Sequence, residues 1–373
     1  MPSLTCTISR PTLRFAIDVQ KGLSRDIQGL VDFVKSLHVH ILVLITNGQV
    51  ASLYGAELQA ELKKHMRLLM LTMPSGESAK CRAVKEELEN QMFEHGCGRD
   101  TCVLALGGGV VCDVAGYVAA TYCRGLPLIL LPTSLMAMVD AAIGGKTSVN
   151  VPQGKNLIGV YHQPQRIIID PDLLKSLPEK EFKNGIIEMI KHGLIADAEY
   201  FDFLEANLPA LLQRDEIILE KAIYESCRIK KEIVERDEKE AGLRSLLNFG
   251  HTVGHALEKV TQYRMSHGEA VARGIIVESE LAHLSGELNP SSLKRISAII
   301  NRCDLLHTPI EITAEQLLAA MLLDKKTRKQ KPRIVLLQDI GKPRQEGQEF
   351  CFAINESHFQ CAIERLCNAL CCH

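Results

Sequence analysis

The sequence predicts an α/β N-terminal domain built on a parallel β-sheet, followed by a mainly α-helical C-terminal domain. Two observations support this prediction. Short apolar runs alternate with helix-like stretches in the first half, and apolar residues recur three and four positions apart in the second half. A chain of 373 residues is long enough for two domains of ordinary size. We expect the boundary near Pro178, which divides the chain into residues 1–178 and 179–373.

Each apolar run of the first half has the length of a strand that is covered on both faces. These runs are Ile41–Thr46, Cys102–Leu106, Leu128–Leu131 and Arg166–Ile169. Helix-like stretches, for example Ala56–Met70 and Ala79–His95, lie between several of them. Alternating strands and helices indicate a parallel sheet, which binds ligands at the carboxyl ends of its strands. The loop after Leu106 is therefore the first place to look for a binding site.

From Glu181 onward the apolar residues follow the period of amphipathic helices, with charged residues on the other face. The clearest group is Ile217, Ile218, Ala222, Ile223 and Cys227. One late segment, Arg333–Leu337, is expected to be a strand.

The composition and the apolar pattern do not suggest a nucleic-acid-binding, secreted or membrane-spanning protein. Hydrophobic residues make up 46% of the chain and charged residues 24%, as in a soluble globular enzyme. A formal net charge of -2 gives no reason to expect nucleic acid or an anionic membrane as a partner. The first residues lack the pattern of a secretory signal. The most apolar stretch, Leu126–Val139, contains Pro127 and Pro132 and is too short to span a bilayer.

Most of the 13 cysteines lie singly in apolar segments, where cysteine acts as a small buried hydrophobe. Examples are Cys102, Cys123, Cys227 and Cys303. Without an export signal we expect a reducing, cytoplasmic setting and no disulfide framework. The tail contains Cys367, Cys371, Cys372 and His373, but no second ligand pair at zinc-finger spacing. We expect a packed or frayed terminus there in preference to a metal site.

A glycine-rich segment, Gly107–Asp113 (GGGVVCD), directly follows a predicted strand. Glycines at such a turn let backbone amides approach a pyrophosphate, but the dinucleotide fingerprint requires glycine where Cys112 stands. From these residues alone, a structural turn and a nucleotide site are equally well supported. The pattern disfavours a P-loop, because Gly145-Lys146-Thr147 would need glycine at the position of Asp140.

Two histidines, His251 and His255, lie four residues apart and would share one face of a helix. His267 follows them, and Glu188 and His192 are also four apart. Imidazoles with one carboxylate and an open position are the ligands of a catalytic zinc. The alternative is that these histidines form hydrogen bonds in the core. Spacing does not decide which of the three residues His251, His255 and His192 are ligands.

Cationic residues cluster in the same segments, several of them beside glycine or asparagine, as expected for groups that bind phosphate or carboxylate. They are Lys146, Lys155, Lys191, Lys230 and Arg244, each of which taken singly also fits a solvated surface. The basic run Asp324–Lys331 lacks aromatic residues. It is therefore interpreted as a solvated loop or a phosphate clamp and not as a nucleic-acid site.

In this order, these segments resemble the 3-dehydroquinate synthase family. The resemblance rests on Gly107–Gly116, Met138–Thr147, Gly154–Gly159, Gly185–Lys191, Asp237–Glu240, Gly242–His255, His267–Val271 and Asp324–Lys326. It covers the chain from about residue 41 to residue 341, and the segment from Arg244 to His255 is its most specific part.

The resemblance implies a nucleotide-binding α/β domain, a helical domain, an active site between them and a homodimer. Zinc, or another divalent ion such as cobalt, would be held by Glu188, His251 and His267, which leaves His255 for proton transfer. Lys230 and Arg244 would hold the substrate carboxylate. The phosphate would be held by Lys146, Asn248, one of Lys325 or Lys326, and Arg124 of the partner subunit. Further polar groups would be Asp140, Lys155, Asn156, Lys191 and Glu240.

The family's second cofactor is NAD. Its implied contacts are Asn47, Ser75, Gly76, Glu77, Lys80, Gly109, Val110, Val111, Cys112, Asp113, Thr133, Ser134, Lys146, Lys155, Leu173, Leu174, Lys175 and Ser176. The sequence departs from the family pattern at Cys112, where glycine is usual, at Asn47, where aspartate is frequent, and at Ala141 and Ala142, where hydroxyl residues are usual. We expect weaker NAD binding at most, and tighter binding on changing Cys112 to glycine if its side chain crowds the pyrophosphate.

The implied reaction converts 3-deoxy-arabino-heptulosonate 7-phosphate to 3-dehydroquinate and phosphate. It proceeds through transient oxidation by NAD, phosphate elimination, re-reduction and aldol closure, and belongs to the shikimate pathway of aromatic amino acid biosynthesis. Alternatives are another sugar-phosphate cyclase, a metal-dependent polyol dehydrogenase, and a non-catalytic binding protein on the same fold. The two predicted anion sites favour a substrate with both a carboxylate and a phosphate.

Overall fold

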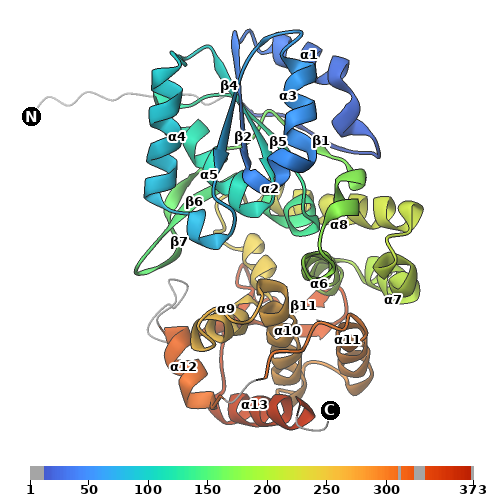
Figure 1. The fold of residues 1–373 in the computed structure, drawn as a ribbon. Helices are drawn as coiled ribbons and strands as arrows, with labels where there is room; N and C mark the ends of the chain where they lie inside the picture. Colours follow the sequence, from blue (N-terminus) through green and yellow to red (C-terminus); the bar gives the residue numbers. More distant parts are fainter. Residues whose placement is uncertain (1–11, 310–311, 323–331, 371–373) are drawn as a thin grey trace, which may run out of the picture.

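The computed structural model describes residues 12–309, 312–322 and 332–370. Its N-terminal half contains a six-stranded sheet in which all the paired strands are parallel (Figure 1). In sheet order the strands are β1 (Ala16–Val19), β8 (Arg166–Ile169), β5 (Leu128–Pro132), β4 (Thr101–Gly107), β2 (Ile41–Asn47) and β3 (Arg67–Met73).

Helices cover both faces of this sheet, and the apolar composition of the strands reflects that burial. They are α1 (Ile27–Ser36), α2 (Gly48–Val50), α3 (Ala56–Leu62), α4 (Arg82–Glu94) and α5 (Gly109–Thr121). Figure 1 shows α1 and α3 on one side of the sheet and α4 on the other. Every residue of β4 is buried, as expected for a central strand with apolar residues on both faces. The predicted parallel sheet is confirmed.

The four predicted strands are confirmed to within one residue at each end, whereas one predicted helix is wrong over its last part. In the stretch Ala56–Met70, α3 ends at Leu62 and the chain then forms β3 from Arg67. The apolar residues of Arg67–Met73 pair with β2 along its whole length. A single apolar run does not distinguish such a strand from the continuation of a helix. The stretch Ala79–His95 is helical from Arg82, after a turn at Glu77–Ala79.

The strand order fixes the edge of the sheet at which a ligand binds. The chain runs from β2 to β3 on one side and then crosses to β4 on the other side of β2. Such a reversal opens a crevice outside the carboxyl ends of the two strands. Asn47 ends β2 and Gly107 ends β4, so the glycine-rich turn lies at this crevice.

Between β5 and β8 the chain forms a β-hairpin of β6 (Lys146–Val151) and β7 (Gly154–Tyr161), which packs against α5. The C-terminal half is mainly helical. Its helices are α6 (Glu179–Ala196), α7 (Ala198–Leu212), α8 (Glu216–Arg236), α9 (His251–Val260), α10 (His267–Leu284), α11 (Pro290–Arg302), α12 (Ala314–Leu322) and α13 (Glu356–Leu370).

The segment Arg333–Leu337 was predicted to be one strand. It is extended as predicted, but it contributes to two short strands that belong to different ladders. β9 (Arg333–Val335) pairs with β12 (Cys351–Ala353), and β10 (Leu337–Asp339) pairs with β11 (Lys342–Pro343). Among the described helices, none is both long enough and apolar enough to cross a membrane. Cys102, Cys227 and Cys303 are buried free thiols as predicted, whereas Cys123 is partly exposed.

The central helix of the molecule is α6, which contacts α7, α8 and α10 as well as the turn Ala137–Ala141 (Figure 1). Nearly all of its length is buried, including the charged or polar residues Glu188, Lys191 and His192. Burying ionisable groups is costly unless they are paired or bind a ligand. These residues therefore mark the centre of the candidate site.

Candidate functional site

Three helices bring together one carboxylate and two imidazoles. Glu188 on α6 lies opposite His251, the first residue of α9, and His267, the first residue of α10. Oε1 of Glu188 is 3.6 Å from Nε2 of His251 and 3.8 Å from Nε2 of His267. One ligand atom from each of the three residues lies within 4.8 Å of the others. This is the ligand set that the family resemblance implies.

The close packing of α9 on α10 depends on a glycine. Gly250, directly before His251, has φ +76°, and a Cβ there would lie 2.6 Å from Cγ1 of Ile275 and 2.9 Å from the carbonyl oxygen of Val271. Its amide also donates to the buried carboxylate of Glu278 at 3.0 Å. Glycine accepts both the left-handed backbone and the close approach, so it sets the position of His251 next to α10.

The residues present fit a divalent cation. Glu188 is fully buried and, although the ammonium of Lys191 pairs with it, neither of its oxygens takes part in a hydrogen bond. A buried carboxylate without hydrogen bonds is unfavourable, and a cation held jointly with two imidazoles would satisfy it. The other cluster around Glu188 includes Asp140 and His192. There Asp140 already pairs with Lys230 at 2.6 Å, so the group of Glu188, His251 and His267 is the better match to a cation.

Spacing alone left His192 and His255 as alternative ligands, and each belongs to a further group of possible ligands, Asp140 with Glu188 and His192, and Glu258 with His255 and His267. Nδ1 of His192 is 2.8 Å from Oγ of Ser226, and its Nε2 faces Asp140 at 3.9 Å. Burial and the neighbouring Lys191 hold the pKa of His192 well below its usual value, so it is neutral. The ring of His255 lies 5.5 Å from that of His251 and 6.0 Å from that of His267.

A further carboxylate, Glu258, belongs to this cluster and was not predicted. It is 4% exposed, and its Oε2 lies 3.5 Å from Nδ1 of His267, while its Oε1 accepts from Lys155 at 3.0 Å. Burial raises its pKa, but His267 and Lys155 outweigh burial and lower the pKa to about 2. A signal was available in the sequence, because residues 251, 255 and 258 follow one face of a helix.

Beside the histidine cluster, Asp140 binds Lys230 of α8. Nζ of Lys230 lies 2.6 Å from Oδ1 of Asp140 and also donates to the Asp140 carbonyl. Burial lowers the pKa of Lys230 to about 8. Burial raises the pKa of Asp140, but Lys230 and Lys191 outweigh it and keep this pKa well below its ordinary value.

Arg244 is a fully buried guanidinium close to Lys230. It donates to the carbonyl of Gly144 at 3.0 Å and to the carbonyl of Glu238, while its Nε is buried without a hydrogen-bond partner. A Cβ at Gly144, where φ is +104°, would lie 2.3 Å from Nη2 of Arg244. The glycine therefore creates the space that this guanidinium occupies. A buried donor without an acceptor is suited to binding an anion.

A third group of polar residues is organised by Glu240. Its two carboxylate oxygens accept from Nζ of Lys146 at 2.5 Å and from Nδ2 of Asn248 at 2.7 Å. Lys146 begins the β6–β7 hairpin, whereas Asn248 precedes α9, so this carboxylate joins the two halves of the chain. Three residues that the resemblance assigned to one site are thus in contact.

At the carboxyl edge of the sheet, the segment Gly109–Asp113 forms the first turn of α5. Asp113 pairs with the buried ammonium of Lys80, which also donates to Asn156 on the hairpin. Glu77 accepts from Asn150 of the same hairpin at 2.7 Å. The thiol of Cys112 is buried and lies 3.7 Å from the carbonyl oxygen of Gly107. Burial also raises its pKa strongly.

Other predicted nucleotide contacts are distributed along the same edge. Oδ1 of Asn47 accepts from the amide of Val50 at 2.9 Å and so caps α2. Thr133 and Ser134 directly follow β5, and Ser75 and Gly76 follow β3. These positions agree with a ligand at the carboxyl edge of the sheet.

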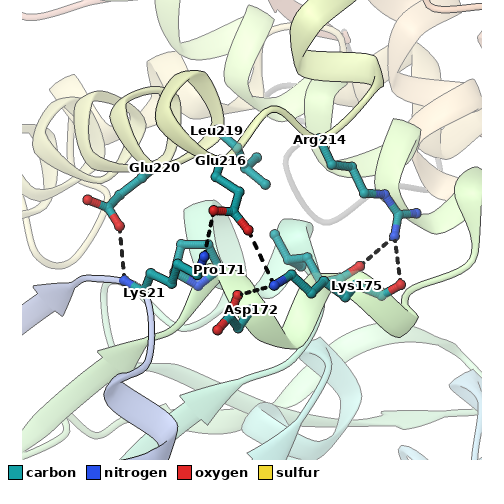
Figure 2. Close-up of a pocket in the computed structure, with 9 residues that line it drawn as sticks. Lys21, Pro171, Asp172, Lys175, Arg214, Glu216, Leu219 and Glu220 are labelled. Carbon is teal, nitrogen blue, oxygen red and sulfur yellow. Dashed lines mark hydrogen bonds and ion pairs between the residues drawn. The ribbon is translucent and has the colours of Figure 1, made fainter.

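The segment Leu173–Ser176 has a different environment. Leu173 and Leu174 are core residues, so only their backbone is available to a ligand. Figure 2 shows Lys175 paired with Asp172 at 2.7 Å and Glu216 at 3.4 Å, beside a cavity of about 30 Å³. That volume holds about one water molecule, so the cavity is too small for a cofactor.

Arg124, which the resemblance assigned to the phosphate site of the partner subunit, follows the C-terminal end of α5. Arg124 has φ +70° and lies beyond the end of α5, on the side opposite the glycine-rich turn. A helix of 13 residues is about 20 Å long. Lys325 and Lys326 lie outside the described residues, as do Cys371, Cys372 and His373 of the tail.

The arrangement matches solved structures of sugar-phosphate cyclases. The 2-epi-5-epi-valiolone synthase from Streptomyces hygroscopicus subsp. jinggangensis 5008, solved with NAD⁺ and Zn²⁺, superposes with a TM-score of 0.87. It is 28% identical, over 98% of this chain and 99% of that one. A 2-deoxy-scyllo-inosose synthase complexed with carbaglucose-6-phosphate, NAD⁺ and Co²⁺ shares the fold at 24% identity, with a TM-score of 0.86 over 94% and 96% of the two chains. The fold is that of the sugar-phosphate cyclases.

Sequence comparison places the chain more narrowly. The model of the N-terminal domain of 3-dehydroquinate synthase matches residues 70–184, and that of the C-terminal domain matches residues 185–327. The 3-dehydroquinate synthase of Pseudoalteromonas translucida (strain TAC 125) is 45% identical over 80% of this chain and 84% of its own length. The chain therefore belongs to the 3-dehydroquinate synthase family.

Proposed function

We propose that this protein converts 3-deoxy-arabino-heptulosonate 7-phosphate to 3-dehydroquinate and phosphate, with NAD and a divalent metal ion as cofactors. One observation carries the proposal. A cluster of one buried carboxylate and two imidazoles is accompanied by two candidate anion sites, the buried cations Lys230 and Arg244 and the more exposed Lys146 with Asn248. A substrate with a carboxylate at one end and a phosphate at the other matches this arrangement of charge.

The metal ion would be held by Glu188, His251 and His267, and zinc, or cobalt in its place, suits these ligands. NAD would lie at the carboxyl edge of the sheet, with its pyrophosphate at the first turn of α5. When bound, the two groups supply reversible hydride transfer and polarisation of a substrate oxygen. The metal ion and NAD would stay bound to the protein, and the reaction would consume neither.

The protein's own residues would fix both ends of the substrate. Lys230 and Arg244 bind the carboxylate, and Asp140 holds the Lys230 ammonium in position. Lys146 and Asn248 bind the phosphate, and Glu240 keeps the two side chains together. Holding both anionic ends keeps the reacting carbons in register through several chemical steps.

Proton transfer is assigned to His255, whose ring centroid lies 5.5 Å from that of His251 and 6.0 Å from that of His267. A neutral imidazole near the metal site accepts a proton when a hydroxyl is oxidised and returns it later. Phosphate elimination requires no external acid in this scheme, since Lys146 stabilises the departing anion. Lys191 balances the charge of Glu188 and Asp140.

A homodimer is part of the proposal. Following the resemblance, Arg124, which lies just after the C-terminal end of α5, would complete the phosphate site of the partner subunit. The hairpin presents the exposed apolar side chains Leu157, Val160 and Tyr161, which a second copy would cover. One of Lys325 or Lys326 would close the phosphate site. The two-domain division at residue 178 and a cytoplasmic location also belong to the proposal.

Two other activities fit the fold. A cyclase for a sugar phosphate without a carboxylate would have no use for both Lys230 and Arg244, and a polyol dehydrogenase would need neither anion site. The deciding experiment measures phosphate release from 3-deoxy-arabino-heptulosonate 7-phosphate with NAD⁺ and Zn²⁺, and then with chelator. We expect chelator-sensitive release without net NADH. Stoichiometric NADH from simple polyols, with no phosphate release, would establish the dehydrogenase instead.

A further inference from the structure

The interaction between Glu258 and His267 extends the metal cluster beyond its three ligands. His267 directs Nε2 towards Glu188 at 3.8 Å and Nδ1 towards Oε2 of Glu258 at 3.5 Å. The two nitrogens of this imidazole therefore face two different carboxylates. Glu188 lies on the metal side, and Glu258, at 4% exposure, is buried on the opposite side.

We propose that Glu258 is a positioning residue that holds the imidazole of His267 in the orientation and tautomer required for binding the metal. This inference rests on the proposed metal site. An imidazole binds a metal through one nitrogen only if the proton is on the other. A carboxylate at Nδ1 keeps the proton there, leaves the lone pair of Nε2 for the metal and makes that nitrogen more basic.

The position of Glu258 is itself fixed from the other half of the chain. Lys155, on β7 of the hairpin, donates to Oε1 of Glu258 at 3.0 Å, and its ammonium lies 4.3 Å from the ring centroid of Tyr263. Each oxygen of the carboxylate thus has its own partner. The chain of contacts from Lys155 through Glu258 to His267 connects a hairpin at the nucleotide edge to a metal ligand.

A simpler role for Glu258 would be to neutralise Lys155 inside the protein. That role predicts a loss of stability when the carboxylate is changed, but no specific effect on metal binding. The positioning role predicts weaker metal binding in protein that remains folded. The two roles therefore differ in what is measured on the metal-free chain and on the metal complex.

The experiment measures the zinc dissociation constant by competition with a chelator, using the full chain without substrate or NAD. Glu258→Gln should weaken zinc binding by about 10- to 100-fold, the range observed when a carboxylate behind a ligand histidine is changed. Glu258→Asp keeps the charge but shortens the reach, and should also weaken zinc binding. The matched control is Glu280→Gln on α10, whose carboxylate accepts from Arg365 at 2.7 Å and should leave zinc binding unchanged.

A second measurement reports the tautomer directly. Nitrogen-15 NMR of the metal-free protein should show His267 with its proton on Nδ1, and Glu258→Gln should shift the population towards the other tautomer. Zinc binding within twofold of wild type in both Glu258 variants, with an unchanged tautomer, overturns the inference. If wild type binds no zinc, or if His251→Ala binds it equally well, the proposed metal site is wrong instead. If Glu258→Gln does not fold, the zinc dissociation constant of Glu258→Asp decides between the two roles.

Discussion

Nζ of Lys230 lies 2.6 Å from Oδ1 of Asp140, and the ammonium is almost completely buried. Lys230 comes from α8, whereas Asp140 lies in the turn after β5, so this ion pair joins the helical half to the sheet. Its ammonium is one of the two cations proposed for the substrate carboxylate. Burial of this ammonium lowers its pKa and so determines the pH range in which Lys230 carries its charge.

The first prediction concerns the pH dependence of the reaction. Burial lowers the pKa of Lys230 to about 8, so the side chain is a cation below this pH and loses its charge as the pH rises above it. We expect kcat/KM for the phosphorylated acid to fall about tenfold per pH unit above that value, since kcat/KM reports groups of the free enzyme. Lys230→Arg should shift the fall to higher pH, because arginine keeps its charge. A profile identical to wild type in that variant would remove Lys230 from substrate binding.

The second prediction concerns the glycine that positions His251. Gly250→Ala adds a Cβ 2.6 Å from Ile275 in a left-handed backbone, so both strain and overpacking act against the fold. The free energy of unfolding should fall by about 2–5 kcal/mol in chemical denaturation, and zinc affinity should fall with it. Gly286→Ala is the control, because Gly286 also has φ +76° but no atom lies within 4 Å of the added Cβ. It should cost only about 1 kcal/mol and leave zinc binding unchanged.

The third prediction concerns Cys112, which stands where the nucleotide turn usually has glycine. Since its thiol is buried and lies 3.7 Å from the carbonyl oxygen of Gly107, Cys112→Gly should leave the dissociation constant of NAD unchanged. It should lower the free energy of unfolding by about 1–2 kcal/mol, because glycine weakens a helix and leaves a small cavity. Both quantities are measured on the same protein, by NAD titration and by denaturation. Tighter NAD binding would restore the crowding hypothesis.

The parallel sheet and the metal-ligand set were predictable for different reasons. The strands were found because central strands such as β4 are buried on both faces and therefore uniformly apolar. The edge strand β3 was missed, since its pairing with β2 is a tertiary contact that a local pattern does not contain. Spacing suggested a metal site among these histidines and Glu188, but only the resemblance assigned the ligands to Glu188, His251 and His267. Glu258 was missed because its partners, Lys155 and His267, come from other elements.

The fourth prediction tests whether Arg124 acts on the partner subunit. Arg124→Ala and His255→Ala should each abolish phosphate release on their own, because each removes a group of every site. A dimer with one subunit of each kind contains one complete site, in which the subunit with intact His255 receives Arg124 from its partner. Mixing equal amounts after dissociation and reassociation should therefore restore about a quarter of wild-type activity.

The same mixture separates this arrangement from one in which Arg124 serves its own chain. In that case every subunit of a mixed dimer lacks either Arg124 or His255, and no activity returns. The control mixes Lys146→Ala with His255→Ala, since Lys146 and Glu240 are in contact within one chain at 2.5 Å. That pair should not complement. Recovery with Arg124→Ala but not with Lys146→Ala would place the guanidinium across the dimer interface, and equal failure of both would place it within one subunit.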